Sequence, residues 1–287
     1  MGKKVWALIR LCRLNKPFLA IPFAGTAAYL ASEGTPDLAK LVYLFCAAIA
    51  GFMAGNIFNG ITDRKIDSVN PRTMDRPLVT GELTVKEASV ALVVAVAIVI
   101  TATVLINPVL ILLLPIPLVL IFIYSLSKRY TWFCHFILAT VNAVCPVAGW
   151  LIFGYWLDWR ILIPGAIVFT WTVGFELIYS SQDIQYDIQE HTFSIPSVFG
   201  IKAAYIISAI SHCITLILYV PLVIFTHCGA IFVILSAFSS LILVAEHIMV
   251  CKYNMNNAAK TFDMNQVYSL LIFLSAILDK QIYIPIF

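Results

Sequence analysis

Long apolar segments separated by short polar ones dominate this sequence. Nine segments are apolar over a length close to the roughly 20 residues that a membrane-spanning helix needs. They cover residues 17–33, 39–58, 88–107, 109–126, 132–154, 161–181, 203–226, 229–250 and 264–279. Glycine, proline and asparagine mark the short breaks between them. The pattern predicts an all-α, polytopic membrane protein with nine transmembrane helices.

The composition supports a membrane setting and narrows the functional classes. Hydrophobic residues make up 61% of the chain and charged residues 11%, whereas soluble domains carry roughly 25% charged residues. The net charge of +3 is too small to indicate nucleic-acid binding. The seven cysteines form no CxxC pair and lie mostly in apolar segments, which predicts neither a zinc site nor a disulfide framework.

The positive charges indicate the orientation in the membrane. With nine spans, 15 of the 18 Lys and Arg residues fall on one side, which includes the N-terminal segment. The positive-inside rule makes this side cytoplasmic, and we expect a bacterial inner membrane. Two long connections, 59–87 and 182–202, face the same side. We find no linker and no removable signal peptide, so we predict one domain over 1–287, its basic N-terminus forming an interfacial helix.

The first long connection opens with evenly spaced oxygen-bearing side chains. Asn59, Asp63 and Asp67 are spaced i, i+4, i+8. On a helix this spacing places all three on one face, one turn apart. Such a row suits magnesium, which takes one or two carboxylates together with substrate phosphate oxygens and water.

A second pair of carboxylates repeats this spacing at the start of the other long connection. Asp183 and Asp187 are again four residues apart. Either motif alone would equally fit a solvated helix face or a set of helix caps. Both together, on the same membrane side, predict one cavity in which four carboxylates need cations for neutralisation. Two magnesium ions bridging a diphosphate would supply that charge.

Basic side chains follow these motifs closely. Arg72 and Arg76 lie after the first motif, and Lys128 and Arg129 stand in the segment YSLSKRYT that begins at Tyr124. Arg and Lys bind phosphate oxygens. Singly, each would equally fit a positive-inside residue, but their clustering beside the carboxylates predicts a diphosphate-binding role.

These motifs together resemble the UbiA superfamily of intramembrane prenyltransferases. The resemblance rests on NGITDRKID, NPRTMDRPLVTGEL, YSLSKRYTWFCH and ELIYSSQDIQYDIQEHTFSIPSVFG, and it extends from LNKPFLAIPF to the last span. It implies nine helices around a central cavity that opens sideways to lipid. It also implies transfer of a polyprenyl group from polyprenyl diphosphate to an aromatic acid, without nucleic acid or an obligate protein partner.

The resemblance also implies roles for particular residues. The metal ligands, which are also the residues carrying catalysis, would be Asp63, Asp67, Asp183 and Asp187, with Asn59 as a further ligand. The diphosphate-binding residues would be Asn59, Arg72, Arg76, Tyr124, Lys128 and Arg129. The cofactor would be Mg²⁺, as two ions bridging the diphosphate. We expect Phe58, Tyr124, Trp171 and Tyr179 to line the cavity and to shield an allylic cation from water.

Three features depart from the family pattern, and the acceptor stays open. Gly60 and Glu176 stand where the family often has Asp, and NKPFLAIPF differs from an RPIG-type start. The nearest branch is similar to 4-hydroxybenzoate polyprenyltransferases of ubiquinone biosynthesis. A dihydroxynaphthoate acceptor, leading to menaquinone, is the alternative.

Two rival classes differ in the placement of their charged residues. An ion or solute transporter would favour charge near the membrane midplane, where only Glu176 fits. A CDP-alcohol phosphotransferase would require a DGxxAR motif, which the sequence lacks.

Overall fold

The computed structural model describes residues 2–14, 19–154, 156, 158–250 and 257–286, and these residues fold into helices and connecting turns. The α-helices are α1 (Gly2–Leu11), α2 (Ile21–Ala31), α3 (Leu38–Thr62), α4 (Arg64–Asp67), α5 (Val85–Ile106), α6 (Pro115–Ser127), α7 (Cys134–Phe153), α8 (Leu162–Ser180), α9 (Ile184–Gln189), α10 (Ile195–Thr226), α11 (Ala230–Met249) and α12 (Ala258–Gln281). Short 3₁₀ turns are η1 (Pro108–Leu112), η2 (Trp159–Ile161) and η3 (Ser181–Asp183).

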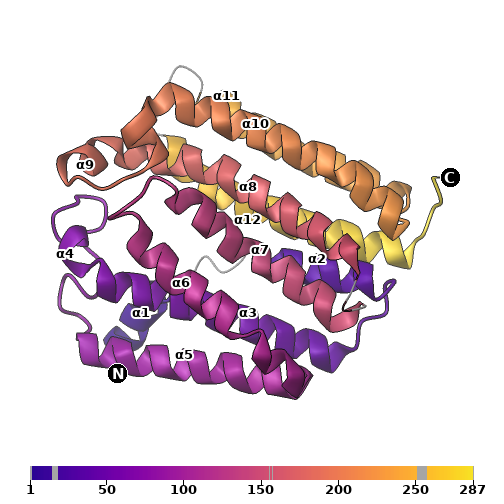
Figure 1. Ribbon diagram of the computed structural model, residues 1–287, viewed down its shortest axis with the longest axis horizontal. Helices are drawn as coiled ribbons and strands as arrows, with labels where there is room; N and C mark the ends of the chain where they lie inside the picture. Colours follow the sequence, from indigo (N-terminus) through magenta and orange to yellow (C-terminus); the bar gives the residue numbers. More distant parts are fainter. Residues whose placement is uncertain (1, 15–18, 155, 157, 251–256, 287) are drawn as a thin grey trace.

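The long helices lie side by side along one axis (Figure 1). Among the described residues, eight helical segments are long and apolar enough to cross a membrane. They are Leu38–Thr62, Val85–Ile106, Pro108–Ser127, Cys134–Phe153, Trp159–Gln189, Ile195–Thr226, Ala230–Met249 and Ala258–Gln281. The predicted segment 17–33 contains α2, an apolar helix of 11 residues, and begins partly outside the described residues. The chain is therefore a multi-pass integral membrane protein.

Local sequence explains where the helices begin and end. Asn107 ends α5, and its Oδ1 accepts a hydrogen bond from the Val109 amide at 3.0 Å, which starts η1 as the Asn-Pro pair predicts. The connection expected at 182–202 is instead mostly helical, because α9 and the first turns of α10 occupy it. Gly200, with a φ of 84°, kinks α10 close to the predicted start of the span at 203. The segment 182–202 had been predicted as a long connection, but tertiary packing gives it helical structure.

The largest buried side chains form a core among α2, α7, α8, α10, α11 and α12. Trp150, Trp171, Phe175, Phe232 and Tyr268 are at most 2% exposed. The Trp171 ring packs on Phe175 at a centroid distance of 4.9 Å. The core therefore joins these six helices into one packed unit.

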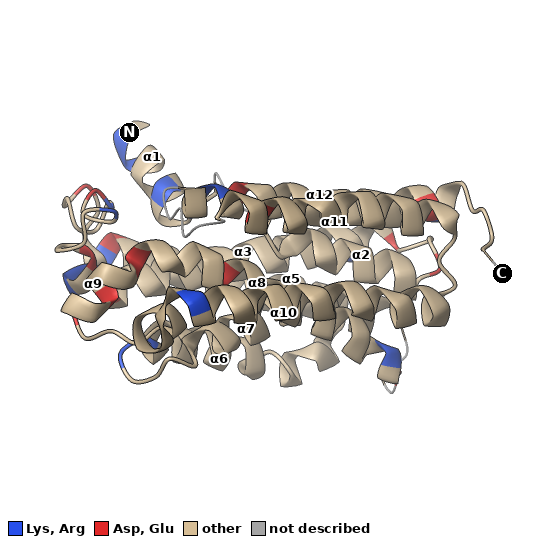
Figure 2. Cartoon of the chain, turned by 90° about the horizontal axis from the view of Figure 1, so that it is seen from above, with Lys and Arg blue, Asp and Glu red and all other residues tan. Residues whose placement is uncertain are grey.

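Charged residues gather at the end of the bundle that carries α1 and α9 (Figure 2). This agrees with the predicted asymmetry of Lys and Arg, although Lys16 and Lys252 lie outside the described residues. The two ends of the chain lie at opposite ends of the bundle (Figure 1). The basic N-terminus forms the predicted helix, α1. The six described cysteines are free thiols.

A buried carboxylate joins α11 and α12 at the end of the bundle away from α9. Asp279 is 0% exposed, and its two oxygens accept hydrogen bonds from the amides of Gly229 and Phe232 at 2.8 and 2.9 Å. These amides belong to the unpaired N-terminal turn of α11, where a negative group is most favourable.

We expect Asp279→Ala to lower the unfolding free energy by about 2–4 kcal/mol, because two buried amides lose their acceptor. Asp37 caps α3 from an exposed position by accepting from the Lys40 amide at 3.1 Å, so Asp37→Ala provides a matched control. Its expected cost is about 1 kcal/mol. Thermal unfolding of both variants in detergent measures the difference, and equal losses would contradict the buried capping role.

Candidate active site

The first motif lies where α3 leaves the bundle. Asn59 is in the last turn of α3, Asp63 follows the helix, and Asp67 ends the short helix α4. The helical hydrogen bonds continue across the break, because the Asp63 amide donates to the Asn59 carbonyl at 2.8 Å and the Asp67 amide to the Asp63 carbonyl at 2.7 Å. The one-turn spacing predicted from the sequence is therefore preserved, although α3 and α4 are two helices.

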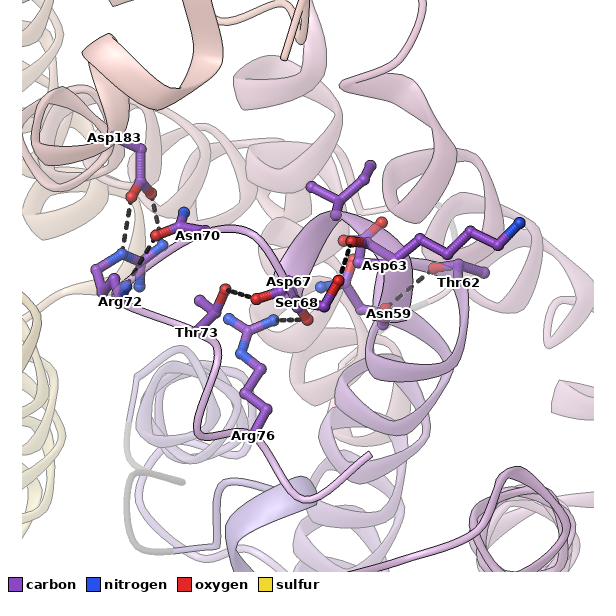
Figure 3. A network of polar contacts seen from close by, with 12 residues as sticks. Asn59, Thr62, Asp63, Asp67, Ser68, Asn70, Arg72, Thr73, Arg76 and Asp183 are labelled. Atoms are coloured by element: carbon purple, nitrogen blue, oxygen red, sulfur yellow. Dashed lines mark hydrogen bonds and ion pairs between the residues drawn. The ribbon is translucent and has the colours of Figure 1, made fainter. Parts of the chain in front are cut away.

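The polypeptide after α4 folds back and brings two arginines to the motif. The Asn70 side chain accepts from the Arg72 amide at 2.9 Å, and the Thr73 hydroxyl donates to the Asp67 carbonyl at 3.1 Å. These bonds fix a tight turn. Arg76 then reaches back, and its Nη1 donates to Asp67 Oδ2 at 2.6 Å (Figure 3).

The second motif lies at the same end, after α8. Asp183 ends η3, and Asp187 lies in α9. Two hydroxyls hold the Asp187 carboxylate: Thr192 Oγ1 donates to Oδ1 at 2.8 Å and Ser194 Oγ to Oδ2 at 2.7 Å. Ser194 is also the N-cap of α10, so the start of that helix positions the carboxylate.

Direct contacts join the two motifs across 111 and 120 residues of sequence. Arg72 forms a two-pronged ion pair with Asp183, from Nε to Oδ1 at 2.8 Å and from Nη2 to Oδ2 at 2.5 Å (Figure 3). The Tyr186 hydroxyl donates to the Ile66 carbonyl at 2.6 Å. The motifs therefore face each other, as their common side of the membrane predicted.

The connection between α6 and α7 closes the third side. Arg129 Nη2 donates to the Thr62 carbonyl at 2.6 Å and to Asp63 Oδ1 at 3.1 Å. The Lys128 carbonyl accepts from the Phe193 amide at 2.7 Å, which links this connection to the segment after the second motif. The first motif, the second motif and the connection between α6 and α7 therefore bring their charged side chains together at this end of the bundle.

Burial and neighbouring charges set the ionisation of the groups outside the spans. Burial raises the pKa of the Asp63 carboxyl, and the hydrogen bond from Arg129 offsets this only in part. Burial alone would lower the pKa of Lys128 and Arg72. However, the carboxylate of Asp187 beside Lys128 and that of Asp183 beside Arg72 hold both pKa values above the ordinary range. Both basic groups therefore stay protonated.

These side chains line a polar cavity of about 120 Å³, which we call the charged cavity. Its lining contains all ten residues that were predicted to bind metal or diphosphate: Asn59, Asp63, Asp67, Arg72, Arg76, Tyr124, Lys128, Arg129, Asp183 and Asp187. A larger cavity of about 290 Å³, the apolar cavity, lies between α2, α3, α5, α6 and α7. Five residues line both and form the neck between them: Arg13, Asn59, Tyr124, Glu176 and Phe262.

Some expectations about the lining were wrong. Trp171 is 0% exposed in the packed core, and Phe58 packs edge-on against Phe122 at a centroid distance of 4.2 Å, and neither lines the two cavities. Tyr124 and Tyr179 do line the charged cavity. The sequence could not show which aromatic side chains near the motifs line the cavity, because the orientation of each ring depends on packing.

The sequence had not singled out Arg13, Tyr186 or Phe262 as site residues, although they line the charged cavity. Tyr186 lies inside the second motif, which was a usable signal, whereas Arg13 and Phe262 come from distant ends of the chain. The structure also explains why glycine stands at position 60, where the family often has Asp. A Cβ at this position would lie 2.8 Å from Leu11 Cδ1 of α1.

Comparison with known proteins assigns this arrangement to a family. The model of the UbiA prenyltransferase family matches residues 19–276. The chain belongs to the UbiA prenyltransferase family. This confirms the resemblance found in the motifs and removes the transporter and phosphotransferase rivals.

Curated relatives of this UbiA-family prenyltransferase include two bacterial enzymes named 4-hydroxybenzoate octaprenyltransferase. The protein of Shewanella loihica is 30% identical over 212 residues, covering 69% of this chain and 70% of its own. That of Francisella tularensis strain SCHU S4 is 26% identical over 289 residues, covering 95% and 97% of the two chains.

Solved structures show the same fold. A UbiA homologue from Aeropyrum pernix K1 superposes with a TM-score of 0.83 at 28% identity, covering 92% of this chain and 97% of its own. A homologue from Archaeoglobus fulgidus, bound to GPP and Mg²⁺, superposes with a TM-score of 0.68 at 18% identity, covering 95% and 99%.

Proposed function

We propose that this UbiA-family enzyme transfers a polyprenyl group from polyprenyl diphosphate to a ring carbon of 4-hydroxybenzoate, a step of ubiquinone-type quinone biosynthesis. The observation that carries the proposal is the junction of the two cavities. A chamber lined by carboxylates and basic side chains meets a larger apolar chamber at a common neck. This arrangement matches the two halves of a prenyl diphosphate, one doubly charged and the other hydrocarbon. The names of the relatives from Shewanella and Francisella support the acceptor.

The donor set of the charged cavity fits magnesium. Asn59, Asp63 and Asp67 would hold one ion, and Asp183 and Asp187 would hold a second. Among the described residues, no three His, Cys, Asp or Glu side chains come together as a metal site of their own. The homologue from Archaeoglobus fulgidus was solved bound to GPP and Mg²⁺, which supports a magnesium-dependent site for prenyl diphosphate. Bound there, magnesium would neutralise the diphosphate and favour its departure.

The side chains of the chain itself perform the remaining work. Lys128, Arg72 and Arg76 would bind the diphosphate oxygens and stabilise the charge that develops as the allylic C–O bond breaks. The electron pair leaves with the diphosphate. Tyr124 and Phe262 lie at the neck, where an electron-rich ring face would stabilise the allylic cation. The ring carbon ortho to the phenol oxygen then attacks, and loss of its proton restores aromaticity.

The topology of the proposal follows from charge and helix order. We place α2 as the first of nine transmembrane helices around the central cavity. One domain would span 1–287, and its active-site segments, 59–87 and 182–202, would face the cytoplasm of a bacterial inner membrane. The positive-inside rule supports this orientation, because the charged cavity lies at the end of the bundle where Lys and Arg gather (Figure 2).

Membranes containing the protein should convert 4-hydroxybenzoate and a polyprenyl diphosphate to a C-prenylated acid in a magnesium-dependent reaction. Mass spectrometry of parallel incubations with 4-hydroxybenzoate and with 1,4-dihydroxy-2-naphthoate identifies the acceptor. Product from the naphthoate alone would replace the proposed acceptor with the menaquinone alternative. Removal of magnesium by a chelator should stop turnover, and its restoration should recover it.

A further inference from the structure

The apolar cavity continues from the neck along one face of α3. Its α3 lining begins at Asn59 and proceeds through Asn56, Gly55, Phe52 and Gly51 towards the far end of the helix. Because a helix rises about 1.5 Å per residue, Gly55 lies about 6 Å and Gly51 about 12 Å along the axis from Asn59. A hydrocarbon that begins at the neck and follows this wall would therefore pass Gly55 first and Gly51 second.

Most glycines of the bundle have a packing reason for lacking a side chain. A Cβ at Gly25 would lie 2.5 Å from Phe273, one at Gly149 would lie 2.2 Å from the Ala24 carbonyl oxygen, and one at Gly174 would lie 2.1 Å from His212. At these positions only glycine lets neighbouring helices approach closely.

Gly51 and Gly55 have no such reason. A Cβ at Gly51 would meet nothing within 4 Å, and one at Gly55 would meet only Ile121 Cγ2, at an ordinary 3.6 Å. Neither has a positive φ, since the glycines that do are Gly34, Gly81 and Gly200. Glycine lowers the stability of a helix interior relative to alanine. What these two glycines provide is open space in the wall of the apolar cavity.

We propose that Gly51 and Gly55 set the width of a channel for the isoprenoid tail and thereby determine which tail lengths the enzyme accepts. This inference rests on the proposed function, because it assumes that the apolar cavity holds the tail of the prenyl diphosphate. A side chain at Gly51 obstructs the tail further from the diphosphate than one at Gly55. Substitution at Gly51 therefore discriminates against long donors most strongly.

The test compares two donors on one enzyme. We expect Gly51→Leu to lower the ratio of kcat/KM for octaprenyl diphosphate to that for geranyl diphosphate at least tenfold, because about four carbon atoms enter the channel beyond the reach of the short tail. Cys46→Leu is the matched control, since Cys46 is exposed on the same helix and lines neither cavity. Its ratio should equal that of the wild type.

Two further variants separate channel width from folding. Gly51→Ala should raise the unfolding temperature by roughly 2 °C, because alanine favours the helix and its Cβ meets no atom. The same variant should lower the octaprenyl-to-geranyl ratio. Gly55→Leu should also lower the octaprenyl-to-geranyl ratio, although less than Gly51→Leu does. Adding Ile121→Ala to Gly55→Leu should recover part of this loss, because Ile121 faces Gly55.

The outcomes are distinct. If Gly51→Leu and Gly51→Ala leave the ratio unchanged, or lower activity with both donors equally, these glycines do not measure the tail. If the wild-type protein transfers no prenyl group from either donor, the proposed function itself fails.

Discussion

Replacing Asp63 or Asp187 with asparagine is expected to lower kcat by about 10²–10³-fold, the loss typical when one preorganised charge contact to a transition state is removed. The two carboxylates lie in different motifs and line the same charged cavity. Asparagine preserves the shape of the side chain and removes its charge. It therefore weakens the hold on magnesium and diphosphate without creating a cavity.

Asp75→Asn is the matched control, because Asp75 is exposed on the connection after the first motif and does not line the charged cavity. Its turnover should match that of the wild type. Initial rates, unfolding temperatures and the membrane-inserted fraction are measured for all three variants. Normal turnover by Asp63→Asn or Asp187→Asn would show that the carboxylates are not part of the catalytic machinery.

Magnesium and diphosphate are expected to bind to this enzyme in a coupled manner. Three motif carboxylates are already paired with arginines: Asp183 with Arg72, Asp67 with Arg76 and Asp63 with Arg129. A metal ion that binds alone must separate such a pair and leave an arginine uncompensated. When a diphosphate binds together with the metal, its oxygens accept hydrogen bonds from the guanidinium groups that the aspartates release. Each partner therefore offsets the cost of binding the other.

Calorimetric titration should show that an unreactive prenyl thiolodiphosphate tightens Mg²⁺ binding by about 10–100-fold. Arg72→Ala should reduce this coupling, because Asp183 loses its two-pronged partner and is free for metal without substrate. It should also weaken binding of the thiolodiphosphate. Arg64→Ala is the control, since Arg64 is exposed and lines neither cavity. Equal Mg²⁺ affinity with and without the analogue would contradict the exchange of ion pairs.

The sequence located the spanning helices accurately, because the bilayer constrains their length and composition. A membrane requires every backbone polar group to be paired within a helix, so apolar length alone locates the segments. The predicted 39–58, 132–154 and 229–250 correspond to α3, α7 and α11. The segment at 182–202 was expected to be a loop and is mostly helical, because α9 and the first turns of α10 are too short to show a membrane-spanning apolar run.

The motif residues were also predictable, for a related reason. Asn59, Asp63 and Asp67 are one turn apart in the sequence, and helical backbone bonds maintain that spacing in the structure. Their roles as ligands stay a prediction. Arg13 and Phe262 could not be predicted, because they come from the two ends of the chain and only packing brings them to the neck.

The sequence by itself determined the membrane setting, the helical segments, the side on which charge gathers and the family of the enzyme. These depend on apolar length and short-range spacing, which are local properties of the chain. Only the tertiary structure decided which arginine pairs with which aspartate and which aromatic rings reach the cavity. It also separated the glycines that permit close helix contact from those that leave space. These outcomes depend on how helices far apart in sequence pack together, and that packing is set by the whole bundle at once.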